Sequence, residues 1–575
     1  MPAPLSLGID YGTNSCRAVV VSLEDGAELA SRVFAYPSGE NGILLDPADP
    51  DLARQRPQDW TDGFAEAVSG ALEDLEAAGH DPAGVVAVGI DTTGSTPLPV
   101  DANGAPLSHQ ERFSENLAAQ AWLWKDHTGH AEAAEITTLA RERGEPYLAA
   151  CGGTYSSEWF WSKILRCKRV APDVFEAAHS WVECCDYLTA WACGDTTPET
   201  LKRSVCAAGH KAMFSERWGG LPSEDFLAAL DPALARLRDR LYAEAFPPNE
   251  KAGILRDDLA RACGLPSGIP VAIGAFDAHM GAVGAGVKPG VLVKIMGTST
   301  CDITVGDLAA DGSVPEIEGL CGVVHGSVIG GMAGLEAGQS AVGDLFAWAV
   351  AQLTPGRYGT GGEAHAALNA EAEKLSPGQS GLVALDWNNG NRTVLVDPRL
   401  SGLLLGQTLH TTAAEVYRAC VEATAFGAKV IVDRFESGGV SVDEVVVCGG
   451  IAEKSPMAMQ VYADVLDRPI KTAASSQTCG LGAALSAAVA AGAFVSVEEA
   501  QARMAHVKER VFQPEPRSVA AYAELFAIYK KLHDAFGGVD RAADLSAVMP
   551  ELRRIAEASR KGGALAGAEE SADRG

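Results

Sequence analysis

Apolar and polar residues along the first hundred positions follow patterns that predict strands and one helix. The apolar run at 5–9 (LSLGI) and the run at 17–22 (RAVVVS) flank the turn DYGTNSC, and a third short strand follows the turn LEDGAEL. Residues 57–78 place apolar side chains at helical spacing, and VVAVGID at 85–91 has the composition of a buried strand. We therefore expect three strands, a helix and a strand.

The second half begins in a similar way. VLVKIM at 291–296 runs into the turn GTSTC and the apolar DITV, so the order apolar strand, Gly-Thr turn, apolar strand occurs at the head of each half. Further on we expect two strands, at 327–334 and 444–450, and helices near 336–352 and 411–436. Two such hairpins predict a duplicated α/β fold with a cleft between the lobes.

Composition narrows the class of protein. The 575 residues are 47% hydrophobic, enough for about two to four domains, and 46 Lys and Arg against 75 Asp and Glu give a net charge of −29. This balance argues against nucleic-acid and anionic-membrane partners. The start MPAPLSLGID lacks the basic leader of a signal peptide, and the apolar run 481–495 is too short to span a bilayer, so we expect it to be a buried helix. The 13 cysteines have no paired C-x-x-C spacing and suggest reduced thiols in the cytoplasm.

The two Gly-Thr turns suit a nucleotide phosphate, because glycine allows close approach and backbone N–H and hydroxyl groups donate to phosphate oxygens. Asp10 would reach the phosphates through Mg²⁺ and its waters; the alternative is that it caps the turn. A P-loop is excluded, because GGIAEKS has Glu453 where that motif needs glycine, and GAVGAG at 281–286 lacks the glycine order of a dinucleotide-binding turn. The paired glycines after the strand at 444–450 would pass close to adenosine.

Asp277 is a candidate general base. It follows the apolar strand of IPVAIGAFD and stands among small residues, where its carboxylate could accept a proton from a substrate hydroxyl. The alternative is an ordinary helix N-cap. We expect His279, two residues further on, to be a packed or hydrogen-bonded core histidine.

Together, the strings DYGTNS, GTSTCD, GAFDAH and VVVCGGIAEKS resemble those of the FGGY carbohydrate kinases, members of the sugar kinase, Hsp70 and actin superfamily, over about residues 5–510. The strings DTTGSTP, GHKAMFSERWGGLP, GLEAGQSAVGD and LDWNNGNR are most similar to those of family members that phosphorylate L-ribulose. The resemblance implies two RNase H-like α/β domains with an interlobe cleft. We expect an N-terminal domain at 1–287, a C-terminal domain at 288–510 and a helical extension with a tail at 511–575, fraying from about Ala542.

The resemblance also implies site residues. The first phosphate loop would be Asp10, Gly12, Thr13, Ser15 and Arg17, the second Gly297, Thr298 and Ser299, and the adenosine site Gly449, Gly450 and Ser455. The sugar would contact Ser95, Thr96, Leu98, Trp124, Asp126, Lys211, Asp277 and Glu336. Asp277 would be the general base. Asp10 would hold Mg²⁺ through water, with Asp277 as a second candidate ligand.

Several of these assignments have structural alternatives. Lys211 could be a solvated surface lysine, and Glu336 could begin the helix EAGQSAVGDLFAWAV, where an acid suits the dipole. We expect the adjacent aromatic residues 159–161 to be core, and we leave Lys163 out of the site. Some FGGY members have an asparagine after the paired glycines, whereas this chain reads GGIAEKSP, so the side chain that contacts adenine stays open.

The resemblance implies ATP-dependent, Mg²⁺-dependent phosphorylation of L-ribulose to L-ribulose 5-phosphate in L-arabinose catabolism. The main alternative is a kinase for another ketopentose or pentitol: D-ribulose, ribitol or xylulose. A chaperone or a sugar-responsive regulator would need an added peptide- or DNA-binding module, and only about 60 residues lie beyond the resemblance. For a cytoplasmic enzyme of this kind a homodimer is the base-rate expectation.

Overall fold

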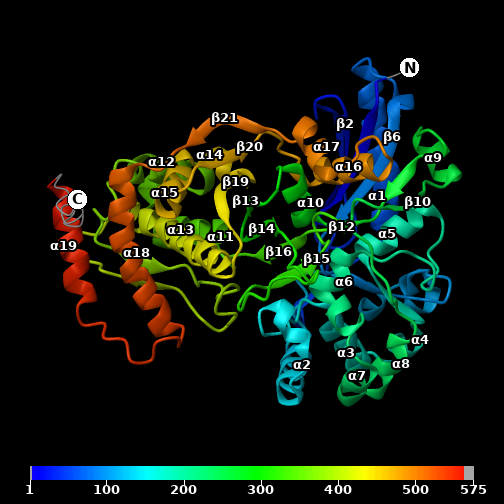
Figure 1. Ribbon diagram of the computed structural model, residues 1–575, viewed down its shortest axis with the longest axis horizontal. Helices are drawn as coiled ribbons and strands as arrows, with labels where there is room; N and C mark the ends of the chain where they lie inside the picture. Colours follow the sequence, from blue (N-terminus) through cyan, green and yellow to red (C-terminus); the bar gives the residue numbers. More distant parts are fainter. Residues whose placement is uncertain (1–2, 562–575) are drawn as a thin grey trace. The chain divides into compact units, whose positions relative to one another are not determined.

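The computed structural model describes residues 3–561, which divide into two compact units (Figure 1). Unit 1 comprises the chain up to Pro289 with Ile303–Leu335 and Ala474–His506; unit 2 comprises Gly290–Asp302, Glu336–Ala473 and the chain from Val507. Each unit is therefore built from segments that are far apart in the sequence. The linear domain boundaries expected at 287 and 510 stay a prediction.

Unit 1 is built on a sheet with the strand order β10-β11-β6-β1-β2-β3, with β12 also pairing β6. Strand β1 pairs antiparallel with β2 and parallel with β6, in a register that places Asp10 opposite both Arg17 and Asp91. The three strands, the helix and the following strand expected for residues 5–91 are confirmed, but two strands that were not predicted, β4 (Leu44–Asp46) and β5 (Asp49–Gln55), lie between the third strand and the helix. The elements are β1 (Leu5–Tyr11), β2 (Ser15–Ser22), β3 (Glu28–Ala35), α1 (Pro57–Ala77), β6 (Val85–Thr92), β10 (Lys251–Ile254), β11 (Pro270–Ala272) and β12 (Ala275–Phe276).

Helix α16 (Thr478–Ala490) packs directly on this sheet although it comes from the far end of the chain. A Cβ atom added at Gly8 would lie 1.8 Å from the Gly480 carbonyl oxygen, and one at Gly89 would lie 2.0 Å from the Ala483 carbonyl oxygen. Only glycine permits such backbone contact. The buried helix expected within 481–495 is confirmed, with its start three residues earlier.

Unit 2 contains the strand order β13-β19-β20-β21. Strands β13, β19 and β20 run parallel, and β21 is antiparallel to β20. A capping box formed by Thr412 and Glu415 starts the long helix α13. The elements are β13 (Gly290–Met296), α13 (Ala413–Ser437), β19 (Val442–Cys448), α15 (Pro456–Leu466), β20 (Ile470–Ala473), β21 (Val507–Phe512) and α18 (Pro516–Phe536).

The segment around Glu336 differs from the expectation. The strand predicted at 327–334 is largely a turn, flanked by β15 (Gly322–His325) and β16 (Ala333–Ala337), and the following helix α11 (Gly343–Leu353) begins seven residues later than predicted. Positive φ angles at Gly326 and Gly331 account for the turn. Glu336 therefore lies in a strand, and the alternative that it begins a helix is wrong.

The chain beyond Ala542 also differs from the expectation. Residues Val548–Arg560 form helix α19 and bury Val548, Leu552 and Ile555 along one face. These residues are four and three positions apart, which is typical of the buried face of a helix. The low overall apolar content of the segment hid this pattern in the sequence. The remainder of the expected tail, 562–575, lies outside the described residues.

Across residues 3–561, no helix combines the length and apolarity needed to cross a bilayer. Ten of the thirteen cysteine side chains are buried and three are partly exposed.

Replacing Gly8 with alanine should destabilise unit 1, because the new methyl group would overlap the backbone of α16. We expect a loss of about 1–3 kcal/mol or more in the free energy of unfolding, measured by denaturant titration. Gly362, in helix α12 (Gly361–Ala372), is the control, since no heavy atom lies within 4 Å of the added Cβ. Equal stability of the Gly8→Ala and Gly362→Ala proteins would contradict the close packing of α16.

Candidate active site

The turn predicted as the first phosphate loop joins β1 to β2 and is held from two sides. The Gly12 N–H donates to the Ser15 carbonyl (2.9 Å), which closes the turn through its own backbone. Gln55 Nε2 donates to the Thr13 carbonyl (2.8 Å), and Trp124 Nε1 donates to the Thr13 hydroxyl (3.0 Å). Trp124, predicted to face the sugar, thus also supports this loop.

Asp10 lies beside a second acid, Asp91, at the carboxyl ends of the neighbouring parallel strands β1 and β6. Oxygen atoms of both carboxyl groups and the Cys479 sulfur all lie within 4.8 Å of one another. Burial raises the pKa of Asp10, while the hydrogen bond from Asp91 and the charge of Arg17 lower it. Arg17 in turn donates to Gln477, so unit 1 itself surrounds Asp10 with both acidic and basic groups.

Asp91 is a site residue that sequence reasoning missed. Its side chain is 0% exposed, and neither oxygen accepts a hydrogen bond from the part of the chain that the structure describes. Burial, and then the charges of Asp10 and Asp277, raise its pKa well above the usual range, so that Asp91 keeps its proton. The signal was present in the sequence, because Gly-Ile-Asp ends both LGID and VGID.

Asp277 is the first residue of helix α10 (Asp277–Gly284), whose N-cap is Phe276. Strand β12 places Ala275 opposite Asp91, so Asp277 emerges at the same end of the sheet as the two other acids. The Ala278 N–H donates to Asp277 Oδ1 (2.6 Å), and the side chain is partly exposed. Its carboxylate is therefore accessible, as a general base requires.

Lys211 ends helix α6 (Val205–Lys211) and is only 5% exposed, so the alternative of a solvated surface lysine is wrong. Its ammonium lies 5.4 Å from the Trp159 ring centre and 5.6 Å from that of Phe276, within cation–π range. Trp159 and its two aromatic neighbours are buried in the core, as expected.

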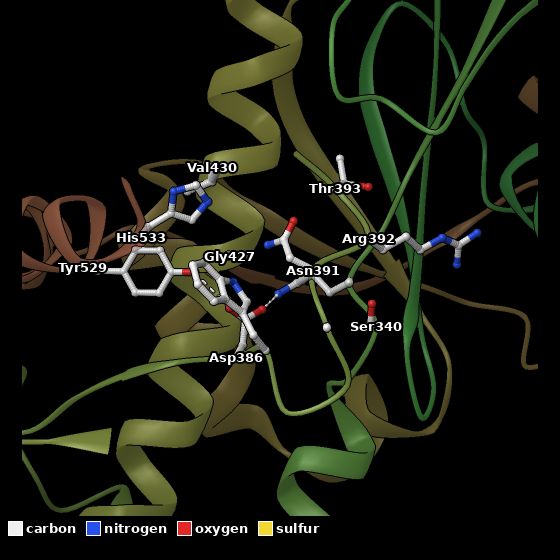
Figure 2. A pocket seen from close by; sticks show the side chains of 12 residues that line it. Ser340, Asp386, Asn391, Arg392, Thr393, Gly427, Val430, Tyr529 and His533 are labelled. Atoms are coloured by element: carbon white, nitrogen blue, oxygen red, sulfur yellow. Dashed lines mark hydrogen bonds between the residues drawn. The ribbon is translucent and has the colours of Figure 1, made fainter. Parts of the chain in front are cut away.

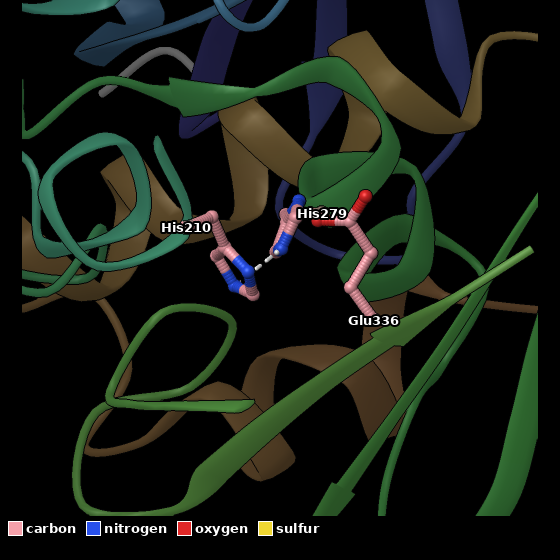
Figure 3. Close-up of side chains that lie close together, drawn as sticks. All are labelled: His210, His279 and Glu336. Atoms are coloured by element: carbon pink, nitrogen blue, oxygen red, sulfur yellow. Dashed lines mark hydrogen bonds between the residues drawn. The ribbon is translucent and has the colours of Figure 1, made fainter. Parts of the chain in front are cut away.

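His210, next to Lys211 in the chain, and His279 face each other with 3.0 Å between their Nε2 atoms (Figure 3). The Ser327 hydroxyl lies 3.1 Å from His210 Nε2. His279 is thus a buried, hydrogen-bonded histidine, as the sequence predicted.

Two predicted sugar contacts point into the protein interior. Leu98 in β7 (Pro97–Val100) is fully buried in a hydrophobic cluster of unit 1. The Asp126 carboxylate is fully buried as well, paired with Arg54 and accepting from the Ala53 N–H (2.8 Å) and the Thr128 hydroxyl (2.7 Å). These contacts account for both side chains structurally, and nothing in the motif LWKDHT signalled that Arg54 would pair with Asp126.

In unit 2, the turn predicted as the second phosphate loop lies between β13 and β14 (Thr300–Gly306). The Gly297 N–H donates to the Ser299 carbonyl (2.9 Å), and the N–H of Val342, at the start of α11, donates to the Thr298 carbonyl (2.8 Å). The start of helix α11 therefore fixes the loop backbone.

The predicted adenosine segment follows β19 in unit 2. Gly449 has a φ of 102°, and a Cβ there would lie 2.3 Å from the Met296 carbonyl oxygen, whereas the space around Gly450 is open. The Ser455 hydroxyl donates to Asn369 (2.7 Å) and accepts from the Ala458 N–H (3.3 Å) as the N-cap of α15. Gly449 is thus required for backbone packing and Ser455 for helix capping, independently of any ligand.

Glu336 is buried in β16 and accepts a hydrogen bond from Arg392 Nη2 (2.9 Å) within unit 2. Arg392 also lines a small polar cavity with Asp386 and Tyr529 (Figure 2). Tyr529 Oη donates to Asp386 Oδ1 (2.9 Å), and Gln339 Nε2 donates to Asp386 Oδ2 (2.7 Å). These hydrogen bonds attach helix α18 to Asp386 and, through it, to Gln339 within unit 2.

A two-unit α/β chain with glycine-rich turns and a group of acids is typical of the sugar kinases. Comparison with known families gives the same class of protein. Residues 5–284 match the N-terminal domain and residues 292–491 the C-terminal domain of the FGGY family of carbohydrate kinases. The chain belongs to this family.

Ribulokinases are among the curated relatives of this chain. That of Shouchella clausii is 42% identical and the match covers 97% of this chain and 99% of the relative; that of Geobacillus thermodenitrificans is 43% identical over 92% and 94%. Among solved structures, a xylulose kinase from Rhodospirillum rubrum superposes with a TM-score of 0.77 at 22% identity, covering 93% of this chain and 99% of that one. This structural likeness confirms the fold.

Replacing Asp91 with asparagine should remove a pH dependence of stability. The folded state keeps a proton on Asp91 that the unfolded chain releases above about pH 4, so the wild type loses stability as the pH rises from there toward the raised pKa. The variant should therefore gain stability relative to the wild type from about pH 5 to pH 8, measured by urea unfolding at fixed pH.

Asp195→Asn is the control of opposite sign, because hydrogen bonds led by that from Thr200 lower the pKa of Asp195. Its loss of stability should grow as the pH rises up to about pH 5, where the unfolded aspartate has ionised, and should stay constant from there to pH 8. A constant difference between Asp91→Asn and wild type across the pH range would show that Asp91 is not held protonated.

Proposed function

We propose that this protein transfers the γ-phosphoryl group of ATP to the 5-hydroxyl of L-ribulose, giving L-ribulose 5-phosphate for L-arabinose catabolism. The observation that carries the proposal is the 42% identity to a ribulokinase across nearly the full length of both chains, inside a family of carbohydrate kinases. The acids of unit 1 support it, because they would supply a base and a cation-binding edge at one end of one sheet.

In this proposal Asp277 orients the sugar hydroxyl and accepts its proton. Phosphoryl transfer has a loose transition state, so positioning and charge neutralisation dominate the catalysis. By the family resemblance, the residues that would bind the sugar hydroxyls are Lys211, Glu336 and the Ser95–Thr96 segment. A buried lysine and a buried glutamate suit this role, because a polar site matched to a hydroxyl discriminates against a sugar that lacks it.

The nucleotide would be held by the Thr13 and Thr298 turns, with the backbone at Gly449 and Gly450 flanking adenosine. A divalent cation fits the acids at the end of β1 and β6: burial raises the pKa values of two adjacent carboxyl groups, only Asp10 of the two is stabilised by the charge of Arg17, and carboxylate oxygens suit Mg²⁺. Asp10 would hold Mg²⁺ through water, with Asp277 as a second candidate. When bound, the cation would neutralise negative charge on the phosphates. We further propose a cytoplasmic enzyme that forms homodimers.

The direct test is ADP release by purified protein with MgATP and a panel of L-ribulose, D-ribulose, L-xylulose, D-xylulose, ribitol and glycerol. We expect the highest kcat/KM for L-ribulose, since hydroxyl-matching polar groups discriminate strongly between stereoisomers. A higher value for another sugar would overturn the substrate, and equal ADP release without sugar would overturn the kinase assignment.

The Asp277→Asn variant should lose turnover by at least roughly 10²-fold while ATP binding survives, because the amide cannot accept the proton. Turnover is measured with the best sugar of the panel, and ATP binding by calorimetry. Asp257→Asn is the matched control, since Asp257 is likewise the first residue of a unit 1 helix, α9 (Asp257–Cys263). Near-normal turnover of Asp277→Asn would remove Asp277 from the role of base.

A further inference from the structure

Lys163 is a buried lysine that the roles described so far leave unused. It lies in helix α3 (Phe160–Val170) and its side chain is 0% exposed. Its Nζ donates to three backbone carbonyls, those of Ser95 (2.8 Å), Leu123 (2.9 Å) and Trp122 (3.2 Å). These bonds use all three N–H donors of an ammonium group.

The three carbonyls belong to two segments that carry predicted substrate contacts. Ser95 lies between β6 and β7, next to Thr96. Trp122 ends strand β8 (Ala121–Trp122), and Leu123 directly precedes Trp124, whose indole holds the Thr13 hydroxyl. A single ammonium group therefore ties the sugar-facing segment of unit 1 to the segment that supports its phosphate turn.

Glu183 accepts hydrogen bonds from two other polar groups of the Ser95–Thr96 segment. It ends strand β9 (Ser180–Glu183), which pairs with β7. Its Oε1 accepts from the Ser95 hydroxyl (2.6 Å) and its Oε2 accepts from the Thr96 N–H (2.8 Å). Ser95 is thus fixed through its carbonyl by Lys163 and through its hydroxyl by Glu183.

Burying these two charged side chains is unfavourable for the stability of the protein. Removing an ammonium and a carboxylate from water is unfavourable, and apolar side chains of similar volume commonly replace buried ion pairs without loss. Burial lowers the pKa of Lys163 to about 7 and raises that of Glu183, which shows the cost directly. Apolar residues cannot form the hydrogen bonds that hold one hydroxyl, one N–H and three carbonyls in fixed orientations.

We propose that Lys163 and Glu183 are positioning residues that set the Ser95–Thr96 segment for binding of the sugar. The inference rests on the proposed function and adds two residues to it. They act through the backbone and side chain of Ser95 and through the backbone of Thr96, and they contact neither the phosphoryl group nor its acceptor.

The test is steady-state kinetics of Lys163→Met and Glu183→Gln, with L-ribulose and ATP varied separately. Methionine keeps the volume of the lysine stem without donors. Glutamine keeps one acceptor oxygen and replaces the other with an NH2 donor, so either the Ser95 hydroxyl or the Thr96 N–H loses its acceptor. We expect KM for L-ribulose to rise by about tenfold or more in each variant, with KM for ATP within about twofold of wild type. The double variant should be no worse than the poorer single variant, because both act on one segment.

Arg418→Met is the control for lost stability. Arg418 is a buried cation of unit 2 that donates to Glu422 (2.9 Å) and to Tyr522 (2.6 Å). In the sequence it lies far from every residue predicted to contact a substrate. Its unfolding temperature should fall while KM for L-ribulose stays unchanged. Unchanged sugar KM in Lys163→Met and Glu183→Gln, or parallel changes for both substrates, would overturn the inference.

The outcomes separate this inference from the proposed function. Wild-type protein that phosphorylates no sugar of the panel would refute the function itself. Wild-type activity with unaltered sugar KM in the variants would refute only the positioning role. If Lys163→Met does not fold, Glu183→Gln decides, because it changes one atom of the side chain and keeps its volume.

Discussion

The backbone contact between helix α16 and strands β1 and β6 is the constraint on which unit 1 depends. Gly8 and Gly89 leave no room for a side chain between the sheet and the helix, so a segment from near residue 480 is held against the first strands of the chain. This contact also brings Gln477 to Arg17 and Cys479 to the acid at position 10. The polar edge of the sheet is thereby assembled from both ends of the sequence.

This edge of the sheet brings acidic groups close together, which is unfavourable for the stability of the fold. Asp10 and Asp91 end two hydrogen-bonded parallel strands, and Asp277 follows the short strand paired with the second of them. Burial of neighbouring carboxyl groups raises their pKa values, which is unfavourable for a fold but useful for binding a cation and accepting a proton. Lys163 and Glu183 are a second case, because both are buried and their hydrogen bonds hold the Ser95–Thr96 segment in place.

Much of this was predictable from the sequence. Apolar runs predicted the strands of residues 5–22, which are almost continuously buried, and helical spacing predicted helix α1 and helix α13, each of which buries an apolar face. Two glycines with positive φ turned the expected strand at 327–334 into a turn, and sparse but regularly spaced apolar residues made α19 a helix. Motif resemblance supplied Asp277 and Lys211, but only three-dimensional contacts show that Asp126 pairs with Arg54 and that Asp91 stands beside Asp10.

The central claim is that the phosphoryl group of ATP is transferred to the terminal oxygen of a ketopentose positioned over Asp277. The most direct measurement is NMR of the product formed from L-ribulose carrying ¹³C at C5, in which phosphorus couples to the carbon whose oxygen it esterifies. The account predicts coupling between phosphorus and C5. Inorganic phosphate without any sugar ester, or a phosphate ester without coupling to C5, would contradict it.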